Sequence, residues 1–381
     1  MKFADILGHE ALKAHLIRSS REQRVSHAQL FLGPEGNGGL ALALAYAQYV
    51  NCSQPTEVDS CSQCSSCKKY ARLIHPDLHF SYPFFAKHKE DTATDFIQEW
   101  RTAFLANPYL TLDFWKQQLE SENKQANINI AEAHAIIKKL SLKAYEGPYK
   151  VLIVWLPEYL DVQGNALLKL IEEPPPNTLF LFVAEQSDKI LSTILSRLQL
   201  VKVGRPSDQE IEHYLLQIPG VSSRQAAEVA LLSQGNLQLA TQLLEEEQIG
   251  HFEIMLSWLR SCVRDAGLQV IQECEQEFAS MSRETQKSFL YYTIHMLRQV
   301  VLVKSGVPQL VHLPEKEFEF VQKFGQNYSI QQIEAAAELL EKAHYHVERN
   351  ANAKLLFLDL SLQLVVLFKY QKIRSMDGLI I

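Results

Sequence analysis

The 381-residue sequence has no run of about 18 apolar residues, the length that a membrane-spanning helix requires. Its first residues, Met1-Lys2-Phe3-Ala4-Asp5, lack the apolar core of a signal peptide. We therefore expect a cytoplasmic chain with no membrane partner. An excess of positive charge is also missing, because the net charge is -7 at pH 7. That balance excludes a surface broadly coated for nucleic acid, so any DNA contact must be local.

Cysteine is scarce, with six residues in the chain. In a cytoplasmic chain, cysteines indicate metal ligands or free thiols before disulfides. Four of them are clustered, with eight residues between the first two and two residues between each later pair: Cys52, Cys61, Cys64 and Cys67. This spacing favours a structural zinc in a closed tetrahedral shell. Buried or redox-active cysteines are the alternative, although the serines around them make the segment polar.

A glycine-rich loop lacks the residues that would make it active. A hydrophobic strand is expected over residues 28–32 and an Ala/Leu-rich helix over residues 40–50, which is the context of the phosphate-binding pattern GxxxxGK[ST]. With Gly33 and Gly38 as its first and last glycines, the lysine and the magnesium-binding hydroxyl belong at positions 39 and 40. The loop residues in question are Gly33, Gly36, Gly38, Gly39 and Leu40.

Gly39 and Leu40 therefore stand where phosphoryl transfer needs an ammonium and a hydroxyl. We expect no ATP hydrolysis, although backbone N–H groups at the helix N-terminus could still attract an anion. An ordinary glycine-rich turn is the alternative. A second catalytic element is also missing, because the buried strand 150–155 ends in Trp155-Leu156-Pro157 rather than in acidic residues. Glu158 lies beyond the proline, and we expect no metal role for it.

The order of the patterns predicts an α/β class followed by an all-α class. Strands and helices alternate from residue 28 to 203, which is typical of a doubly wound parallel sheet. Pro206-Ser207-Asp208 is a helix N-cap signal, and residues 251–368 are almost wholly helical. We therefore expect an α/β domain over 1–204, a small helical domain over 205–248 and a helical domain over 249–381. The tail from residue 375 is expected to be frayed.

Residues 80–127 form an expected insertion whose function the sequence does not reveal. It combines many charges with aromatic residues, and helices are expected over 94–105 and 110–122. Aromatic residues at such spacing more often form a core than a binding surface.

Five features in order resemble one family. They are His27-Ala28-Gln29, the four-cysteine module, His75-Pro76-Asp77, the segment 165–175 and Ser196-Arg197. Together they are similar to the bacterial clamp-loader subunits of DNA polymerase III, in the AAA+ class. The resemblance implies an AAA+ P-loop-type α/β domain with a zinc module, a small helical lid and a C-terminal helical collar for oligomerisation.

Within that family, the resemblance is to the delta-prime branch. The motor subunits, gamma/tau, need the lysine, the hydroxyl and the acidic pair that are absent here, and delta subunits typically lack both the zinc module and the serine-arginine motif. Gln238 also stands at the lid position of an ATP-sensing arginine, and Leu198 replaces the cysteine of the family's serine-arginine-cysteine triplet.

The resemblance implies a non-ATPase stator of the DNA polymerase III holoenzyme, a DNA-directed DNA polymerase. Arg197 would reach in trans to the γ-phosphate on a neighbouring gamma/tau ATPase, with Ser196 supporting it. The chain would join gamma/tau and delta in a five-subunit ring that loads a sliding clamp onto primer-template DNA. Zinc would be structural, and no ATP is expected.

Two other functions stay open from the residues alone. The first is a true ATPase of the gamma/tau type, which would bind nucleotide despite Gly39 and Leu40. The second is a zinc-dependent nucleic-acid-binding module without a ring. Only Lys68, Lys69 and Arg72 flank the cysteines, which is little positive charge for binding phosphates.

Overall fold

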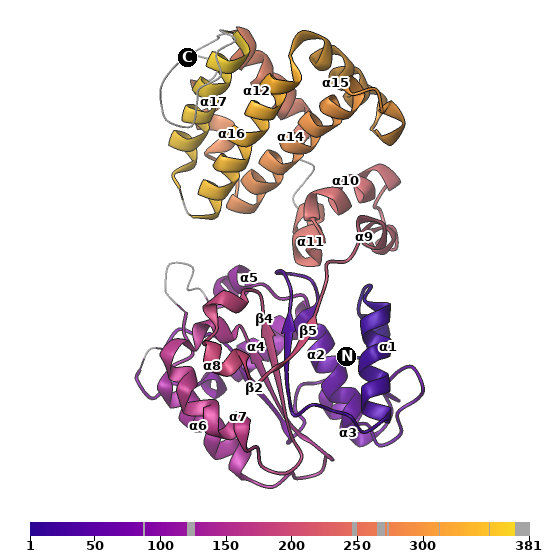
Figure 1. Ribbon diagram of the computed structural model, residues 1–381, viewed down its shortest axis with the longest axis vertical. Helices are drawn as coiled ribbons and strands as arrows, with labels where there is room; N and C mark the ends of the chain where they lie inside the picture. The colour runs from indigo at the N-terminus through magenta and orange to yellow at the C-terminus, as the bar shows by residue number, and fades with distance from the viewer. Residues whose placement is uncertain are drawn as a thin grey trace. The chain divides into compact units, whose positions relative to one another are not determined.

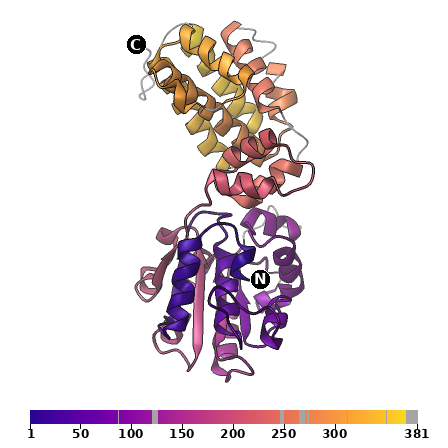
Figure 2. The same ribbon diagram turned by 90° about the vertical axis from the view of Figure 1, so that its right-hand side faces the viewer.

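The computed structural model describes residues 1–86, 88–119, 126–245, 250–264, 271–272, 274–311, 313–349 and 351–369. The chain divides into two compact units, Met1–Gln242 and Leu243–Ile381, which are drawn in Figures 1 and 2. The expected boundary after residue 204 falls inside the first unit and stays a prediction. The tail from residue 375 lies outside the described residues. Within the described ranges, no helix is long and apolar enough to cross a membrane.

The first unit is built on a five-stranded parallel sheet in the order β2-β3-β4-β1-β5. This arrangement confirms the predicted parallel α/β fold. Each side chain of β3 and β4 is buried, as expected for apolar runs covered on both faces. The strands are β1 (Ala28–Leu32), β2 (Leu78–Ser81), β3 (Lys150–Trp155), β4 (Thr178–Ala184) and β5 (Gln199–Lys202).

Strand β2 was not predicted, and it includes the first two residues of the expected insertion. It pairs with β3 from Leu78 opposite Val151 and forms one edge of the sheet. Its four residues include His79 and Ser81, so they make no continuous apolar run. Burial of this strand depends on its neighbours rather than on its own composition.

Helices cover both faces of the sheet (Figure 1). The buried helix α2 (Gly39–Val50) packs against β1, β3 and β4 on one face. On the other face, Leu30, Leu152 and Phe180 share a core with the helices α6 (Ile130–Ser141), α7 (Leu168–Glu172) and α8 (Ser192–Leu195). The period of two along each strand therefore divides its apolar side chains between the two layers.

Short helices complete the first unit. Ser207 caps α9, as the N-cap signal predicts, and its hydroxyl and the Glu210 carboxylate form a capping box. The helix expected over 110–122 begins at Leu112, and residues 120–122 lie outside the described part. The bounds are α1 (Glu10–Arg21), α3 (Ser65–Tyr70), α4 (Ile97–Ala106), α5 (Leu112–Gln118), α9 (Asp208–Leu215), α10 (Ser223–Ser233) and α11 (Leu237–Glu245). Within the described residues of this unit, 3-10 helices span Phe3–Asp5, Ala93–Phe96, Pro157–Tyr159, Asp161–Leu167 and Ser187–Lys189.

The aromatic residues of the 80–127 segment form a core. Trp100 stacks on Tyr82 with ring centroids 4.0 Å apart, and it meets Trp115 edge-on at 5.5 Å. Trp155, at the end of β3, lies 5.4 Å from Trp100. The segment is thus attached to the end of the sheet that carries the glycine-rich loop.

The second unit is helical, as predicted. Trp258 is buried among Phe278, Phe289 and Phe357, and its indole N–H donates to Ser361 Oγ at 2.8 Å. The helix α14 packs against α15 and α16, and α17 packs against α12 and α16. The bounds are α12 (His251–Arg264), a π-helix (Cys274–Phe278), α14 (Arg283–Lys304), a 3-10 helix (Pro308–Leu310), α15 (Glu315–Asn327), α16 (Ile330–Glu348) and α17 (Ala353–Lys369).

Candidate functional site

The glycine-rich loop runs from β1 into α2, as the sequence predicts, but its own side chains fill it. The amide of Asn37 donates to Val203 O at 3.0 Å, and its Oδ1 accepts from the backbone N–H of Gly39 at 2.8 Å. In an anion site, an N–H at the start of the helix would point to the ligand. Here the N–H of Gly39 already has an acceptor from its own loop.

Two other segments of the first unit cover the loop. Gly36 and Gly38 have φ angles of +69° and +88°. A Cβ on Gly38 would lie 2.8 Å from the ring of Tyr109, and one on Gly36 would lie 2.0 Å from the amide oxygen of Asn236. The cavity left at the loop has a volume of about 20 Å³, which is room for about one water molecule.

The covering segments are also bonded to their surroundings. The hydroxyl of Tyr109 accepts from Leu7 N–H at 2.8 Å, and the N–H of Leu237 donates to Gly36 O at 3.3 Å. Gln238, the expected lid position, is buried and accepts a hydrogen bond from the side-chain amide of Asn107. The 80–127 segment therefore joins the loop to the helices that follow residue 205.

Carboxylates lie beside the loop. Glu35 and Glu185 line its cavity. Burial, followed by neighbouring carboxylates that include Glu35 and Glu158, raises the pKa of Glu185 to about 8. Glu158 Oε1 accepts the backbone N–H groups of Glu185 and Gln186, both at 2.7 Å. Glu158 therefore holds the chain that follows β4, and a triphosphate at the loop would meet acidic groups.

Arg197 lies at the surface of the first unit, just after α8, and its side chain is 35% exposed. Its Nε donates to Glu172 Oε1 at 2.6 Å, and its Nη2 contacts the same oxygen. Its Nη1 donates to Thr193 O at 2.6 Å and to Ser196 Oγ at 3.1 Å. Ser196 is the C-cap residue of α8, and its hydroxyl donates to Thr193 O at 3.2 Å. The guanidinium is thus held at the surface by contacts within its own chain.

The four predicted cysteines come together. Their sulfur atoms all lie within 4.8 Å of one another, and the thiols are free of disulfides. Tetrahedral Zn–S bonds of about 2.3 Å place sulfurs about 3.8 Å apart, so a metal fits with a small contraction. Backbone N–H groups of Cys61, Cys64 and Cys67 donate to sulfurs of the cluster at 3.3 to 3.4 Å. The cluster can therefore hold a metal ion, and its donors suit a soft cation such as zinc.

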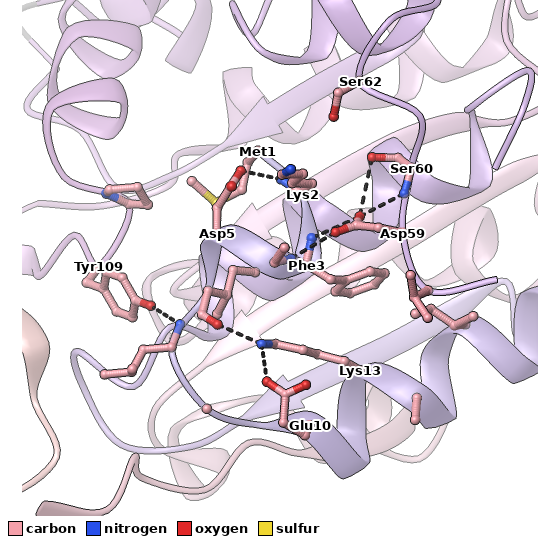
Figure 3. Close-up of a pocket in the computed structure, with 18 of the residues that line it drawn as sticks. Met1, Lys2, Phe3, Asp5, Glu10, Lys13, Asp59, Ser60, Ser62 and Tyr109 are labelled. Carbon is pink, nitrogen blue, oxygen red and sulfur yellow. Dashed lines mark hydrogen bonds and ion pairs between the residues drawn. The ribbon is translucent and has the colours of Figure 1, made fainter. Parts of the chain in front are cut away.

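The segment between the cysteines anchors the start of the chain (Figure 3). The carboxylate of Asp59 accepts the backbone N–H groups of Phe3 at 3.1 Å and Ala4 at 2.8 Å. These residues line one side of a cleft of about 1870 Å³ that also includes Lys13 and Tyr109. No pattern in the sequence indicated this link, because more than fifty residues separate its partners.

The His75-Pro76-Asp77 motif has a structural role. Asp77 is buried, and its carboxylate accepts the backbone N–H groups of Tyr145, Glu146 and Gly147 at 2.6 to 2.8 Å. Burial by itself would raise the pKa of Asp77. The three amides, together with His75, outweigh it and hold the pKa below the ordinary value. The ionised carboxylate thus fixes the turn that leads into β3.

Replacing Asp77 with alanine should lower the free energy of unfolding by about 3 kcal/mol, because three partly buried N–H donors lose a charged, buried acceptor. Because the pKa of Asp77 is depressed in the fold, its contribution is full above the unfolded-state pKa and is lost as the pH falls through the folded-state value. The loss therefore occurs below about pH 4. Urea unfolding at pH 7 and at about pH 2.5 measures both effects, because the lower pH lies within the window of loss, with the exposed Asp188→Ala as control. Equal stability of the two variants at pH 7 would contradict the assignment.

The sheet order, the loop after β1 and the helices packed against it define a P-loop-type α/β protein of the AAA+ class. Residues 8–207, more than half of the chain, match the model of the family described as DNA polymerase III, delta subunit. The chain belongs to this family.

Curated relatives include subunits of more than one type. The delta' subunit of DNA polymerase III from Escherichia coli (strain K12) is 27% identical over 197 residues, which cover 51% of this chain and 47% of that protein. The tau subunit from Bacillus subtilis (strain 168) is 25% identical over 251 residues, or 64% of this chain and 37% of that protein. This chain thus spans less than half the length of these relatives, and identity does not separate the two types.

Among solved structures, a gamma subunit-related protein of DNA polymerase III from Thermotoga maritima aligns over 92% of this chain and 99% of that chain. The identity is 12% and the TM-score 0.37. The RuvB Holliday junction branch migration motor from the same organism aligns over 79% of this chain and 78% of that chain, with 13% identity and a TM-score of 0.39.

Proposed function

We propose that this chain is a non-ATPase subunit of the delta-prime type in the DNA polymerase III clamp-loader complex. It would join gamma/tau and delta subunits in a five-subunit ring that places a sliding clamp on primer-template DNA. Residues 205–248 would serve as its lid and residues 249–381 as its collar. The observation that carries the proposal is the filled loop. Asn37 accepts the backbone N–H of Gly39, and the ring of Tyr109 lies against Gly38, so the donor and the space that a nucleotide phosphate would need are both occupied.

The surroundings of the loop support the absence of ATP chemistry. Gly39 and Leu40 are buried at the start of α2 and offer neither charge nor hydroxyl. The side chain of Gln238 accepts a hydrogen bond from Asn107, so a contact within the protein, rather than a nucleotide, links the proposed lid to the rest of the first unit. Among the described residues that line the loop cavity, none is a lysine or an arginine that could pair with a triphosphate.

Arg197 would supply the chain's contribution to catalysis from outside the neighbouring active site. A fixed guanidinium stabilises the charge that develops on the transferred phosphoryl group, and it cannot lose its proton at neutral pH. Arg197 is exposed and is not among the residues that line the cavity at its own loop, which supports a trans-acting role. Ser196 would help to hold it, since its hydroxyl accepts from the guanidinium.

The four cysteines would bind a structural zinc ion. A closed shell of four thiolates has no open position for substrate, so the metal would stabilise the fold. The competing nucleic-acid role for this module has little support in the contacts around it, because Lys69 is already paired with Glu146.

The purified chain should show no saturable binding of a fluorescent ATP analogue up to about 1 mM, because the loop cavity has room only for a water molecule. The double variant Gly39→Lys, Leu40→Thr restores the missing groups and should still not bind, since Tyr109 and Asn37 remain. A gamma/tau subunit serves as the positive control. Micromolar binding by the unmodified chain would favour the gamma/tau alternative.

A further inference from the structure

Glu172 is the acidic partner of Arg197. It is the last residue of α7 and receives both Nε and Nη2 of the guanidinium on one carboxylate oxygen, Oε1. The opposite side of the guanidinium donates to the carbonyl of Thr193. A carboxylate and a backbone carbonyl therefore fix the plane in which the side chain lies. The adjacent Glu173 is also an exposed glutamate, and within the described part of the chain the ion pair of Arg197 is with Glu172 and not with Glu173.

Both ends of this contact stand on rigid parts of the first unit. Ile171 of α7 and Ile194 of α8 are buried in the same core, at 0% and 1% exposure. The ring of His27, at the start of β1, shares a hydrogen bond of 3.1 Å with Ile171 O, which fixes the last turn of α7. Pro174, two residues after the end of α7, prevents the helix from continuing. The carboxylate of Glu172 is therefore presented to Arg197 from a backbone with little freedom.

We propose that Glu172 is a positioning residue that orients the Arg197 guanidinium toward the γ-phosphate of a neighbouring subunit. The inference rests on the proposed trans-acting role of Arg197. Glu172 does not touch the phosphate; it acts by limiting the rotamers of a long side chain that would otherwise sample many, which lowers the entropy lost when the phosphate is engaged.

The guanidinium keeps donors for the phosphate while Glu172 holds it. A guanidinium has five N–H groups, and the contacts with Glu172 and Thr193 use three of them. The remaining donors include an N–H of Nη1 that donates to the Ser196 hydroxyl at 3.1 Å. Because this hydroxyl is neutral, a charged phosphate oxygen can replace it with little loss of free energy. Orientation and phosphate contact are thus compatible.

Variants at Glu172, Glu173 and Arg197 in the reconstituted complex with gamma/tau and delta test this role. Glu172→Ala should lower the rate constant of single-turnover ATP hydrolysis roughly fivefold, the size expected for losing a strong exposed pair. Glu172→Gln, which keeps the acceptor oxygen, should recover most of the rate, and Glu173→Ala should match the unmodified complex. ATP affinity of the complex should stay unchanged in all three. Glu172→Ala should add nothing to Arg197→Ala.

The outcomes separate this inference from the proposed function. If Arg197→Ala lowers hydrolysis and Glu172→Ala leaves it unchanged or raises it, Glu172 does not position the arginine and the trans role still stands. An equal loss in Glu172→Ala and Glu173→Ala would mean that surface charge, not orientation, is responsible. If Arg197→Ala itself has no effect, the proposed function fails together with this inference.

Discussion

Replacing Arg197 with alanine should lower ATP hydrolysis at the neighbouring gamma/tau site by about 10³-fold or more, because arginine fingers contribute about 10³ to 10⁵ in rate. The complex should still assemble, since the side chain lies at the surface and its hydrogen-bond and ion-pair partners among the described residues are Glu172, Thr193 and Ser196 of its own chain. Single-turnover hydrolysis in the DNA-bound complex measures the gamma/tau site next to Arg197 directly. Steady-state ATP turnover should fall by the fraction of the total rate that this site contributes.

Arg197→Lys is the matched variant for this prediction. It keeps the positive charge but loses the planar fork that matches phosphate oxygens, so its rate should lie between those of the unmodified and the alanine complexes. Native mass measurement checks that each variant still joins gamma/tau and delta. An unchanged rate in an intact Arg197→Ala complex would contradict the trans-acting role.

Loss of metal from the cysteine cluster should cause the largest change in stability. Structural zinc provides about 10 to 16 kcal/mol in isolated zinc-finger peptides. Here the cluster belongs to a larger unit with its own core, so we expect a smaller loss for Cys64→Ser, on the order of 5 kcal/mol, with a fall in Tm of roughly 10 °C or more. Thermal unfolding, together with the zinc content of the purified protein, measures both parts.

A second readout locates the effect of metal loss. The carboxylate of Asp59, between Cys52 and Cys61, binds the amides of Phe3 and Ala4, so chelation should speed hydrogen exchange at those two amides. Ser65→Ala, an exposed change next to Cys64, should leave zinc content and Tm unchanged. If the unmodified protein is purified without zinc and melts at the same temperature as the Cys64→Ser variant, the cluster does not hold a structural metal.

The central strands of the sheet could be predicted because the sequence of each segment is by itself sufficient to assign a strand. Strands β1 and β3 have the predicted bounds, since each is an apolar run bounded by polar or turn-forming residues. The clustering of the four cysteines followed from their spacing. In contrast, β2 is only four residues long and contains His79 and Ser81, so its place in the sheet depends on the partner strand.

The filling of the loop could be predicted only in part. Gly39 and Leu40 showed that the catalytic groups are missing, but nothing local to Tyr109 indicates that its ring covers Gly38. The same holds for the bond between Asn107 and Gln238, whose partners lie more than a hundred residues apart. Contacts of this kind are set by how the 80–127 segment packs as a whole, which periodicity does not encode.

The most direct test of the account is photolabelling of the reconstituted complex with an ATP analogue that carries a photoreactive group on its γ-phosphate. Label on this chain is expected on the peptide containing residues 193–197, and only when gamma/tau is present. Label on residues 33–40, or equal labelling of the isolated chain, would show that the chain binds nucleotide in its own loop and would contradict the account.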